Sequence, residues 1–341
     1  MFGAAALLLV ILLLVAWAWG PANRAHERVE RIDEARLETS LEAKAQPAHP
    51  EAIDDPRHYP IDMRPFADSV DAGAFGIPNF DDEGIVQVEM QVGDDKIAIV
   101  HNPVTAAQYA LGSYERFLHD GDARAYEDFV RHATWLRDQL DDRGRINYLF
   151  YMRSKDIKPP WISAMAQGQA ISVFVRMARE TDDDSWLDAA RLAMTPMLSP
   201  ADEGGTLYMD GDDVWLEEYP ESPPSHVFNG HVFASFGLND LARATGDEDI
   251  LRFWEAATAT IAANLERYEN DGWLRYDLKD TDIAPRQYHR IQRDQVYMLA
   301  SLTGDERFED AARRWNAPYE NRDGWLRSRF WARFSEAVRG R

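Results

Sequence analysis

The stretch WISAMAQGQAISVFVRMARETDDDSWLDAARLAM, residues 161–194, decides the fold of this chain. Apolar residues recur at helical spacing on both sides of the acidic run 182–184. Aspartate in that run can cap the helix that begins at Ser185. The stretch is therefore predicted to form a helical hairpin.

The same pattern occurs four times. The first helices are expected to begin near Val104, Ser163, Val227 and Tyr288, so that successive pairs start 59, 64 and 61 residues apart. Their partners are expected at residues 123–140, 185–198, 247–268 and 305–315, and Gly or Asp residues between the partners supply caps. With every inter-pair loop at one rim, the repeat predicts a mainly α fold, an incomplete α/α toroid of about four helical hairpins. A plain helical solenoid is the alternative, because the repeat does not say whether the ring closes.

The segments before and after the repeat have other patterns. Residues 85–100 alternate apolar and polar and predict a short β-hairpin. Residues 1–19 carry no charge and are long enough to cross a membrane once, with a cleaved signal peptide as the alternative. The expected organisation is a transmembrane anchor at 1–19, a juxtamembrane helix and proline-rich linker at 20–75, a small β region at 76–101, the toroid at 102–320 and a basic aromatic tail at 321–341. The expected location is a membrane, on a side that the flanking charges leave open.

Composition excludes several classes of protein. The chain has 59 acidic and 37 basic residues, a net charge of −22, which argues against nucleic-acid binding. It has no cysteine, which excludes disulfides and thiolate chemistry. It also lacks a nucleophile elbow, a phosphate-binding glycine loop and a zinc-binding His-Glu-x-x-His motif, so we expect neither a cofactor nor a metal.

The inter-pair loops carry the candidate site residues. In WLEEYP, residues 215–220, an extended backbone would point Glu217 and Glu218 in opposite directions, so only one would face a cleft. Aromatic walls would raise the pKa of that carboxylate and let it exchange protons near neutrality. Tyr276 and Tyr288 lie beside cations, which favours an ionised phenol able to act as a base toward an acidic C–H.

Several motifs resemble one family when taken together. They are NPVTAAQYALGSYERFL (102–118), WISAMAQGQAIS (161–172), WLEEYP (215–220), PSHVFNGHVFASFGLNDL (224–241), RYDL (275–278) and YHRIQRDQVYMLASLTGDERFEDAARRW (288–315). In this order they resemble the C-terminal domain of D-glucuronyl C5-epimerases, which convert glucuronic to iduronic acid in heparan-type polymers. The resemblance implies that Glu218, Tyr219, Tyr276 and Tyr288 are catalytic. The residues assigned to substrate binding are Gln167, Gln169, Asn229, Lys279, Arg286, Arg290 and Gln295.

The chemistry of epimerisation agrees with this set. A proton α to a carboxylate must leave one face of the sugar and another must return to the opposite face, while a cation holds the carboxylate. Cations on or beside the loops predict a locally positive cleft: Arg145, Arg153, Lys155, Lys158, Lys279, Arg286 and Arg290.

Two positions depart from the family's pattern. Lys279 stands where the family tends to have Arg, and Asp294-Gln295 stands for its Asn-Gln pair. An unsulfated or differently linked glucuronate polymer or glycan is therefore the expected partner. The prediction is a membrane-anchored uronate C5-epimerase, with a homodimer as one possible assembly. A polysaccharide lyase and a non-catalytic glycan-binding relative are the alternatives.

Overall fold

The computed structural model describes residues 46–73, 80–93, 96–270, 272–280 and 283–319. Its helices are α3 (Glu51–Asp54), α4 (Arg64–Asp71), α5 (Pro103–Asp120), α6 (Ala123–Asp138), α7 (Ala164–Thr181), α8 (Ser185–Met194), α9 (Phe228–Thr245), α10 (Glu248–Asn264), α11 (Arg286–Thr303) and α12 (Glu306–Tyr319). Its strands are β1 (Val88–Gln91), β2 (Ile97–Val100), β3 (Leu207–Asp210), β4 (Asp213–Leu216), β5 (Glu269–Asn270) and β6 (Trp273–Leu274). They form three antiparallel two-stranded sheets, β1–β2, β3–β4 and β5–β6.

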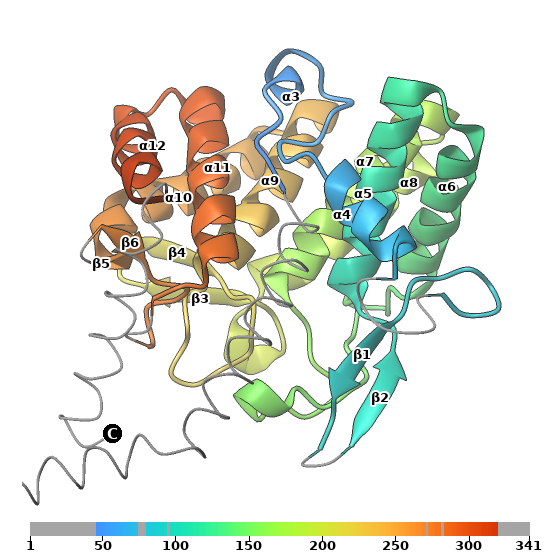
Figure 1. The fold of residues 1–341 in the computed structure, drawn as a ribbon, viewed down its shortest axis with the longest axis horizontal. Helices are drawn as coiled ribbons and strands as arrows, with labels where there is room; N and C mark the ends of the chain where they lie inside the picture. The colour runs from blue at the N-terminus through green and yellow to red at the C-terminus, as the bar shows by residue number, and fades with distance from the viewer. Residues whose placement is uncertain (1–45, 74–79, 94–95, 271, 281–282, 320–341) are drawn as a thin grey trace, which may run out of the picture. The chain divides into compact units, whose positions relative to one another are not determined.

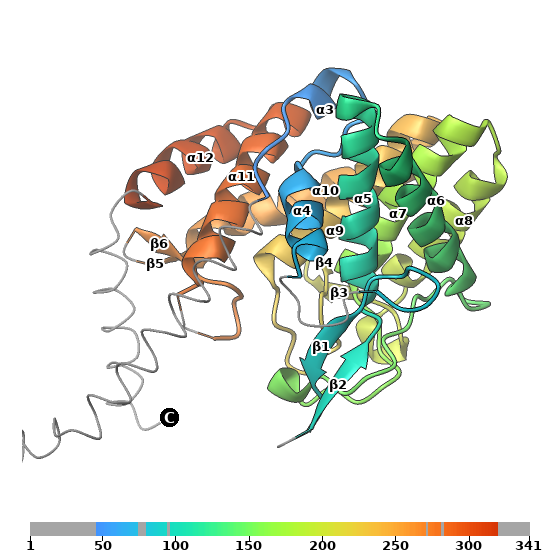
Figure 2. The ribbon, with the colours of Figure 1, turned by 45° about the vertical axis from the view of Figure 1, so that its right-hand side comes forward.

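Four helical hairpins form the body of the domain, as the repeat predicts. They are α5–α6, α7–α8, α9–α10 and α11–α12, and α5, α7, α9 and α11 pack in that order while each partner lies beside its own helix (Figures 1 and 2). The expected caps are present: the Asn102 side chain accepts the N–H groups of Val104 and Thr105, and α9 ends at Gly246 in the left-handed region. The mainly helical fold of α/α-toroid type is confirmed.

Small residues bring α7 and α9 into close contact. A Cβ at Gly168 would lie 2.5 Å from the Cα of Ala234, and a Cβ at Gly237 would lie 2.0 Å from the Gly168 carbonyl oxygen. Neither position has room for a side chain. The glycine of the 161–172 motif is therefore a packing residue between two helices.

The strands lie at the end of the hairpins where α5, α7, α9 and α11 begin, and α3 lies at the opposite end (Figure 1). The loops there are tied to helix N-termini. The first N–H of α7, at Ala164, donates to the Glu217 carbonyl at 2.9 Å, and that of α9, at Phe228, donates to the Tyr276 carbonyl at 3.2 Å. These bonds fix both candidate loops against the helices.

Residues 46–62 differ from the irregular linker that their prolines predict. We call them the N-terminal strap. Tyr59 and Ile61 in it are fully buried. The buried Arg176 guanidinium of α7 donates to the carbonyls of Arg57 at 2.9 Å and His58 at 2.7 Å. The predicted linker also contains a helix, α4, although Pro65 lies within it. Proline is tolerated there because the N–H groups of a helix's first turn make no bond within the helix.

The predicted membrane-spanning helix and membrane location are corrected. No helix within the described ranges is both long enough and apolar enough to cross a bilayer. The proposed anchor at 1–19, the juxtamembrane helix and the tail at 321–341 all lie outside those ranges. The homodimer stays a prediction.

Candidate active site

Glu217 and Glu218 follow β4 and point into different surroundings, as expected for an extended segment. The Glu217 carboxylate pairs with His226, whose Nδ1 lies 2.5 Å from Oε1 and whose backbone N–H donates to Oε2 at 3.1 Å. The His226 ring stacks on Trp215 at 4.1 Å between centroids. Both oxygens of Glu217 are therefore engaged in holding the loop in place. Glu218 is the remaining candidate for the carboxylate that exchanges protons.

Glu218 is a buried carboxylate surrounded by phenols. Only 8% of the residue is exposed, and its Oε1 accepts the Tyr276 hydroxyl at 3.5 Å. Burial raises its pKa to about 7, although hydrogen bonds from Tyr219 and Tyr276 and the charge of Lys155 oppose the shift. This agrees with the prediction of a raised pKa and lets the group gain or lose a proton near neutrality.

The tyrosines are harder to ionise than the sequence predicts. The rings of Tyr276 and Tyr288 meet edge to face at 4.8 Å. Burial and the Glu218 charge raise the pKa of Tyr288 to about 12, and those of Tyr219 and Tyr276 well above their usual value. The prediction of an easily ionised phenol is wrong, because burial and the neighbouring carboxylate, rather than a cation, dominate. At neutral pH the three phenols are proton donors.

An aromatic wall adjoins the phenols. Trp161 stacks on Tyr148 with centroids 3.9 Å apart, and the Tyr219 ring lies 6.0 Å from Trp161. The Trp161 indole N–H donates to the Phe150 carbonyl at 3.0 Å, which fixes the ring. Sequence reasoning gave Tyr148 no role, because only the fold stacks it on the Trp161 motif.

Gly230, in the first turn of α9, makes room for Glu218. A Cβ at this position would lie 2.3 Å from Glu218 Oε2 and 2.7 Å from its Cβ. Sequence reasoning missed this requirement. The only signal was a glycine just inside the start of a predicted helix.

Three predicted cations are already paired with acids. Lys155 Nζ lies 3.2 Å from Glu221 and 3.5 Å from Asp277, and Lys279 Nζ lies 2.7 Å from Glu221. Arg145, the third, pairs with a loop aspartate at 2.8 Å. Acids on the same and on neighbouring loops therefore balance the expected positive cleft. Two further predicted cations, Arg286 and Arg290, lie half-buried in the first two turns of α11.

The predicted amide residues divide into two groups. The Gln167 side chain bonds only backbone groups in these contacts: its oxygen accepts the Ile146 N–H at 2.8 Å, and its nitrogen donates to two carbonyls, both at 2.7 Å. Gln169 is fully buried beside Tyr59 of the strap. Asn229 and Gln295, in contrast, meet next to Gly230, where the Gln295 amide donates to the Asn229 carbonyl at 3.0 Å. Each of these two side chains keeps a buried oxygen without a hydrogen-bond partner among the described residues.

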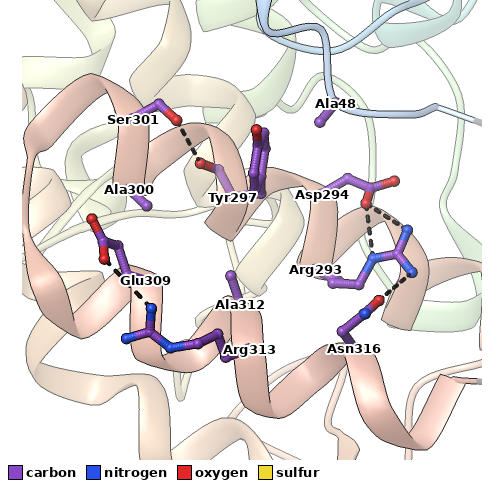
Figure 3. Close-up of a pocket in the computed structure, with 10 residues that line it drawn as sticks. All are labelled: Ala48, Arg293, Asp294, Tyr297, Ala300, Ser301, Glu309, Ala312, Arg313 and Asn316. Atoms are coloured by element: carbon purple, nitrogen blue, oxygen red, sulfur yellow. Dashed lines mark hydrogen bonds and ion pairs between the residues drawn. The ribbon is translucent and has the colours of Figure 1, made fainter.

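A pocket of about 720 Å³ lies elsewhere, between α11, α12 and Ala48 of the strap (Figure 3). Its lining includes Asp294, whose Oδ1 accepts two bonds from Arg293 at 2.9 and 2.6 Å. None of the four predicted catalytic residues lines it. The side chains of Asp294 and Gln295 therefore face different surroundings: Asp294 borders this pocket, and Gln295 contacts Asn229.

The chain is a mainly helical protein of α/α-toroid type, and its candidate active site has a buried carboxylate among phenols. The cellobiose 2-epimerase of Bacillus thermoamylovorans shares this fold, with a TM-score of 0.52 and 14% identity, covering 73% of this chain and 69% of that one. Residues 140–317 match the family described as D-glucuronyl C5-epimerase C-terminus, and the chain belongs to that family. The resemblance of the motifs is thereby confirmed.

Two relatives show how far the similarity extends. The D-glucuronyl C5-epimerase of Caenorhabditis elegans is 27% identical over 209 residues, which are 55% of this chain and 34% of that protein. An uncharacterized protein of Methanocaldococcus jannaschii is 26% identical over 172 residues, 49% of this chain and 56% of that protein. The chain thus spans about a third to just over half of the length of these relatives.

Proposed function

We propose that this chain is a uronate C5-epimerase that converts glucuronate to iduronate within a polysaccharide or glycan. Membership of the family supports this activity. The observation that carries it is a buried carboxylate with a pKa of about 7, Glu218, placed among phenols that stay protonated at that pH. One group is then ready to accept a proton and its neighbours are ready to donate one.

In the proposed forward step, the ionised Glu218 takes the proton from C5 of the sugar. The electron pair of that C–H bond moves into the adjacent carboxylate, and the resulting enediolate carries the charge. The Tyr288 phenol then donates its proton to C5 from the opposite face. Glu218 ends protonated and Tyr288 ends as a phenolate, so protons and charge balance.

The proposed resetting step returns that proton through Tyr276. Its hydroxyl lies 3.5 Å from Glu218 Oε1, and its ring lies 4.8 Å from that of Tyr288. Tyr276 can accept the proton of Glu218 while passing its own to the Tyr288 phenolate. The raised pKa of Tyr288 makes its phenolate a strong base, which favours this return.

The charges near the site support an unsulfated substrate. A uronate carboxylate that binds beside Lys155 and Lys279 would share these cations with Glu221 and Asp277, which already balance their charge. Every sulfate would require a further cation. We therefore propose an unsulfated glucuronate polymer as the substrate class.

The experiment is incubation with heparosan, an unsulfated glucuronate polymer, in heavy water. The expected result is deuterium at C5, measured by NMR, with the chain length unchanged. Chain cleavage with the absorbance of an unsaturated uronate would identify a lyase instead. Binding without exchange, on heparosan and on a panel of other glucuronate polymers, would identify a glycan-binding relative.

A further inference from the structure

A second cluster of ionisable side chains lies away from the candidate active site. His49 and His58 belong to the N-terminal strap, Glu51 is the first residue of α3, and Glu115 is near the end of α5. Figure 1 shows α3 at the end of the domain opposite the strands. Proton transfer at Glu218 makes no use of this cluster.

Glu115 bonds the Nδ1 atom of His58 and lies near that of His49. It is 1% exposed; its Oε2 lies 2.7 Å from His58 Nδ1, and its Oε1 accepts the Tyr59 N–H at 2.7 Å. The same Oε1 lies 3.7 Å from His49 Nδ1. A carboxylate that orients imidazoles through Nδ1 leaves their Nε2 atoms available as ligands, which is the usual outer arrangement of histidine metal sites.

The two Nε2 atoms converge on Glu51. Its Oε2 lies 3.7 Å from His49 Nε2 and 3.6 Å from His58 Nε2. Both separations are too long for hydrogen bonds. They are close to the roughly 3.3–3.5 Å between ligand atoms of a tetrahedral zinc ion with bonds of about 2.0–2.2 Å.

His49 adds an independent observation. The residue is 7% exposed, and its Nδ1 has no hydrogen-bond partner among the described residues. A buried imidazole nitrogen left in this way requires an explanation. A small rotation of the ring onto a cation at Nε2 would bring Nδ1 within reach of Glu115, so that one ion would satisfy both nitrogens.

We infer that His49 Nε2, His58 Nε2 and Glu51 bind one zinc ion, with Glu115 as the carboxylate that positions both histidines. Two imidazoles favour zinc over magnesium or calcium, which prefer oxygen ligands. Asp55 lies 4.0 Å from His58 Nε2, but its carboxylate is held by Arg57, so the fourth ligand is assigned to water. The ion would join three positions of the strap, and the bonds of Glu115 would link them to α5.

This inference revises the expectation that the chain binds no metal. The ligands come from the strap, in a spacing that matches no familiar zinc motif, and Glu115 lies 57 residues beyond His58 in the sequence. Only the fold brings Glu115 to them.

The test is zinc binding by the full chain after treatment with EDTA, measured by titration calorimetry and by metal analysis of the desalted protein. The key variant is Glu51→Gln, because that side chain is 72% exposed and its loss leaves the core intact. The matched control is Glu248→Gln on α10, whose side chain is 85% exposed. Cobalt substitution reports geometry, since a tetrahedral site gives intense visible bands.

One zinc per chain, a tetrahedral cobalt spectrum and at least about a tenfold loss of affinity in Glu51→Gln, but not in Glu248→Gln, are expected. The melting temperature of the wild type should rise with zinc, and that of Glu51→Gln should rise less. Failure of the wild type to retain stoichiometric zinc would overturn the inference. So would equal zinc affinity in Glu51→Gln and the wild type, because the ion would then be bound elsewhere.

Discussion

The Glu218 carboxylate occupies the space that a side chain at Gly230 would need, since a Cβ there would lie 2.3 Å from Oε2. The two residues come from different elements, the loop after β4 and the first turn of α9. The backbone of Gly230 is helical, so any residue could adopt its conformation. Glycine is required there because Glu218 fills the space that a side chain would occupy.

Gly230→Ala should displace Glu218. We expect C5 exchange to fall at least about tenfold and the free energy of unfolding to fall by about 1–3 kcal/mol, the usual range for overpacking. Urea denaturation of a double-mutant cycle with Glu218→Gly measures the coupling. Glycine is the right partner because the Cβ of Glu218 itself lies 2.7 Å from the added methyl group. If Gly230→Ala costs the same in both backgrounds, the steric relationship is wrong.

Glu218 should set the pH dependence of activity. Because its pKa is about 7, the rate of C5 exchange should rise as pH increases through 7, when the carboxylate becomes the base. Glu218→Gln should lower the rate about 10²- to 10⁴-fold. Glu203→Gln, in an exposed turn, is the control and should behave as the wild type. A wild-type rate that is flat from pH 5 to pH 9 would exclude Glu218 as the titrating base.

The same pKa predicts that Glu218 destabilises the fold at alkaline pH. Its folded pKa of about 7 exceeds the ordinary value of 4.5, so the folded state binds more protons than the unfolded state between these values. The free energy of unfolding should therefore decrease as pH rises from 4.5 to 7, by up to about 3 kcal/mol. Glu218→Gln lacks this term and should be more stable than the wild type at pH 8 but not at pH 4. Denaturation at both pH values measures the difference, and the same difference at both would refute the shift.

Tyr288→Phe should separate catalysis from folding. Removal of its hydroxyl takes away the proposed donor while the ring keeps its contact with Tyr276. We expect exchange to fall about 10²-fold or more with little change in heparosan binding. Tyr208→Phe, on the partly exposed strand β3, is the matched control and should retain activity. Loss of binding together with activity would point to a substrate-positioning role instead.

The helical repeat was predictable because its signals are local. The period of the apolar residues and the Gly or Asp at each joint depend on neighbours in sequence, and the hairpins formed where these predicted them. The division of labour between Glu217 and Glu218 was also predictable, from the alternation of an extended strand.

The features that were missed depend on contacts between distant segments. The ionisation of Tyr288 is governed by burial and by Glu218, 70 positions earlier in the chain, so the cations beside it in sequence misled the prediction. The pairing of Lys155 with Asp277 likewise joins two separate loops. Electrostatics at this site follow the fold, and the sequence shows only which charges are present.

Gln167 tests the difference between a binding residue and a structural one. Its amide bridges the Ile146 N–H and the carbonyls of Gly144 and Ala193, which join the loop before α7 to the end of α8. Gln167→Leu leaves these three buried groups unpaired, so the free energy of unfolding should fall by about 3 kcal/mol or more. The KM for heparosan of the protein that remains folded should be unchanged. Gln169→Leu is the matched control on the same helix: its side chain contacts the Tyr59 hydroxyl and bridges no backbone groups, so the loss of stability should be smaller than in Gln167→Leu. A raised KM in a fully stable Gln167→Leu protein would restore the substrate-binding role that the sequence predicts.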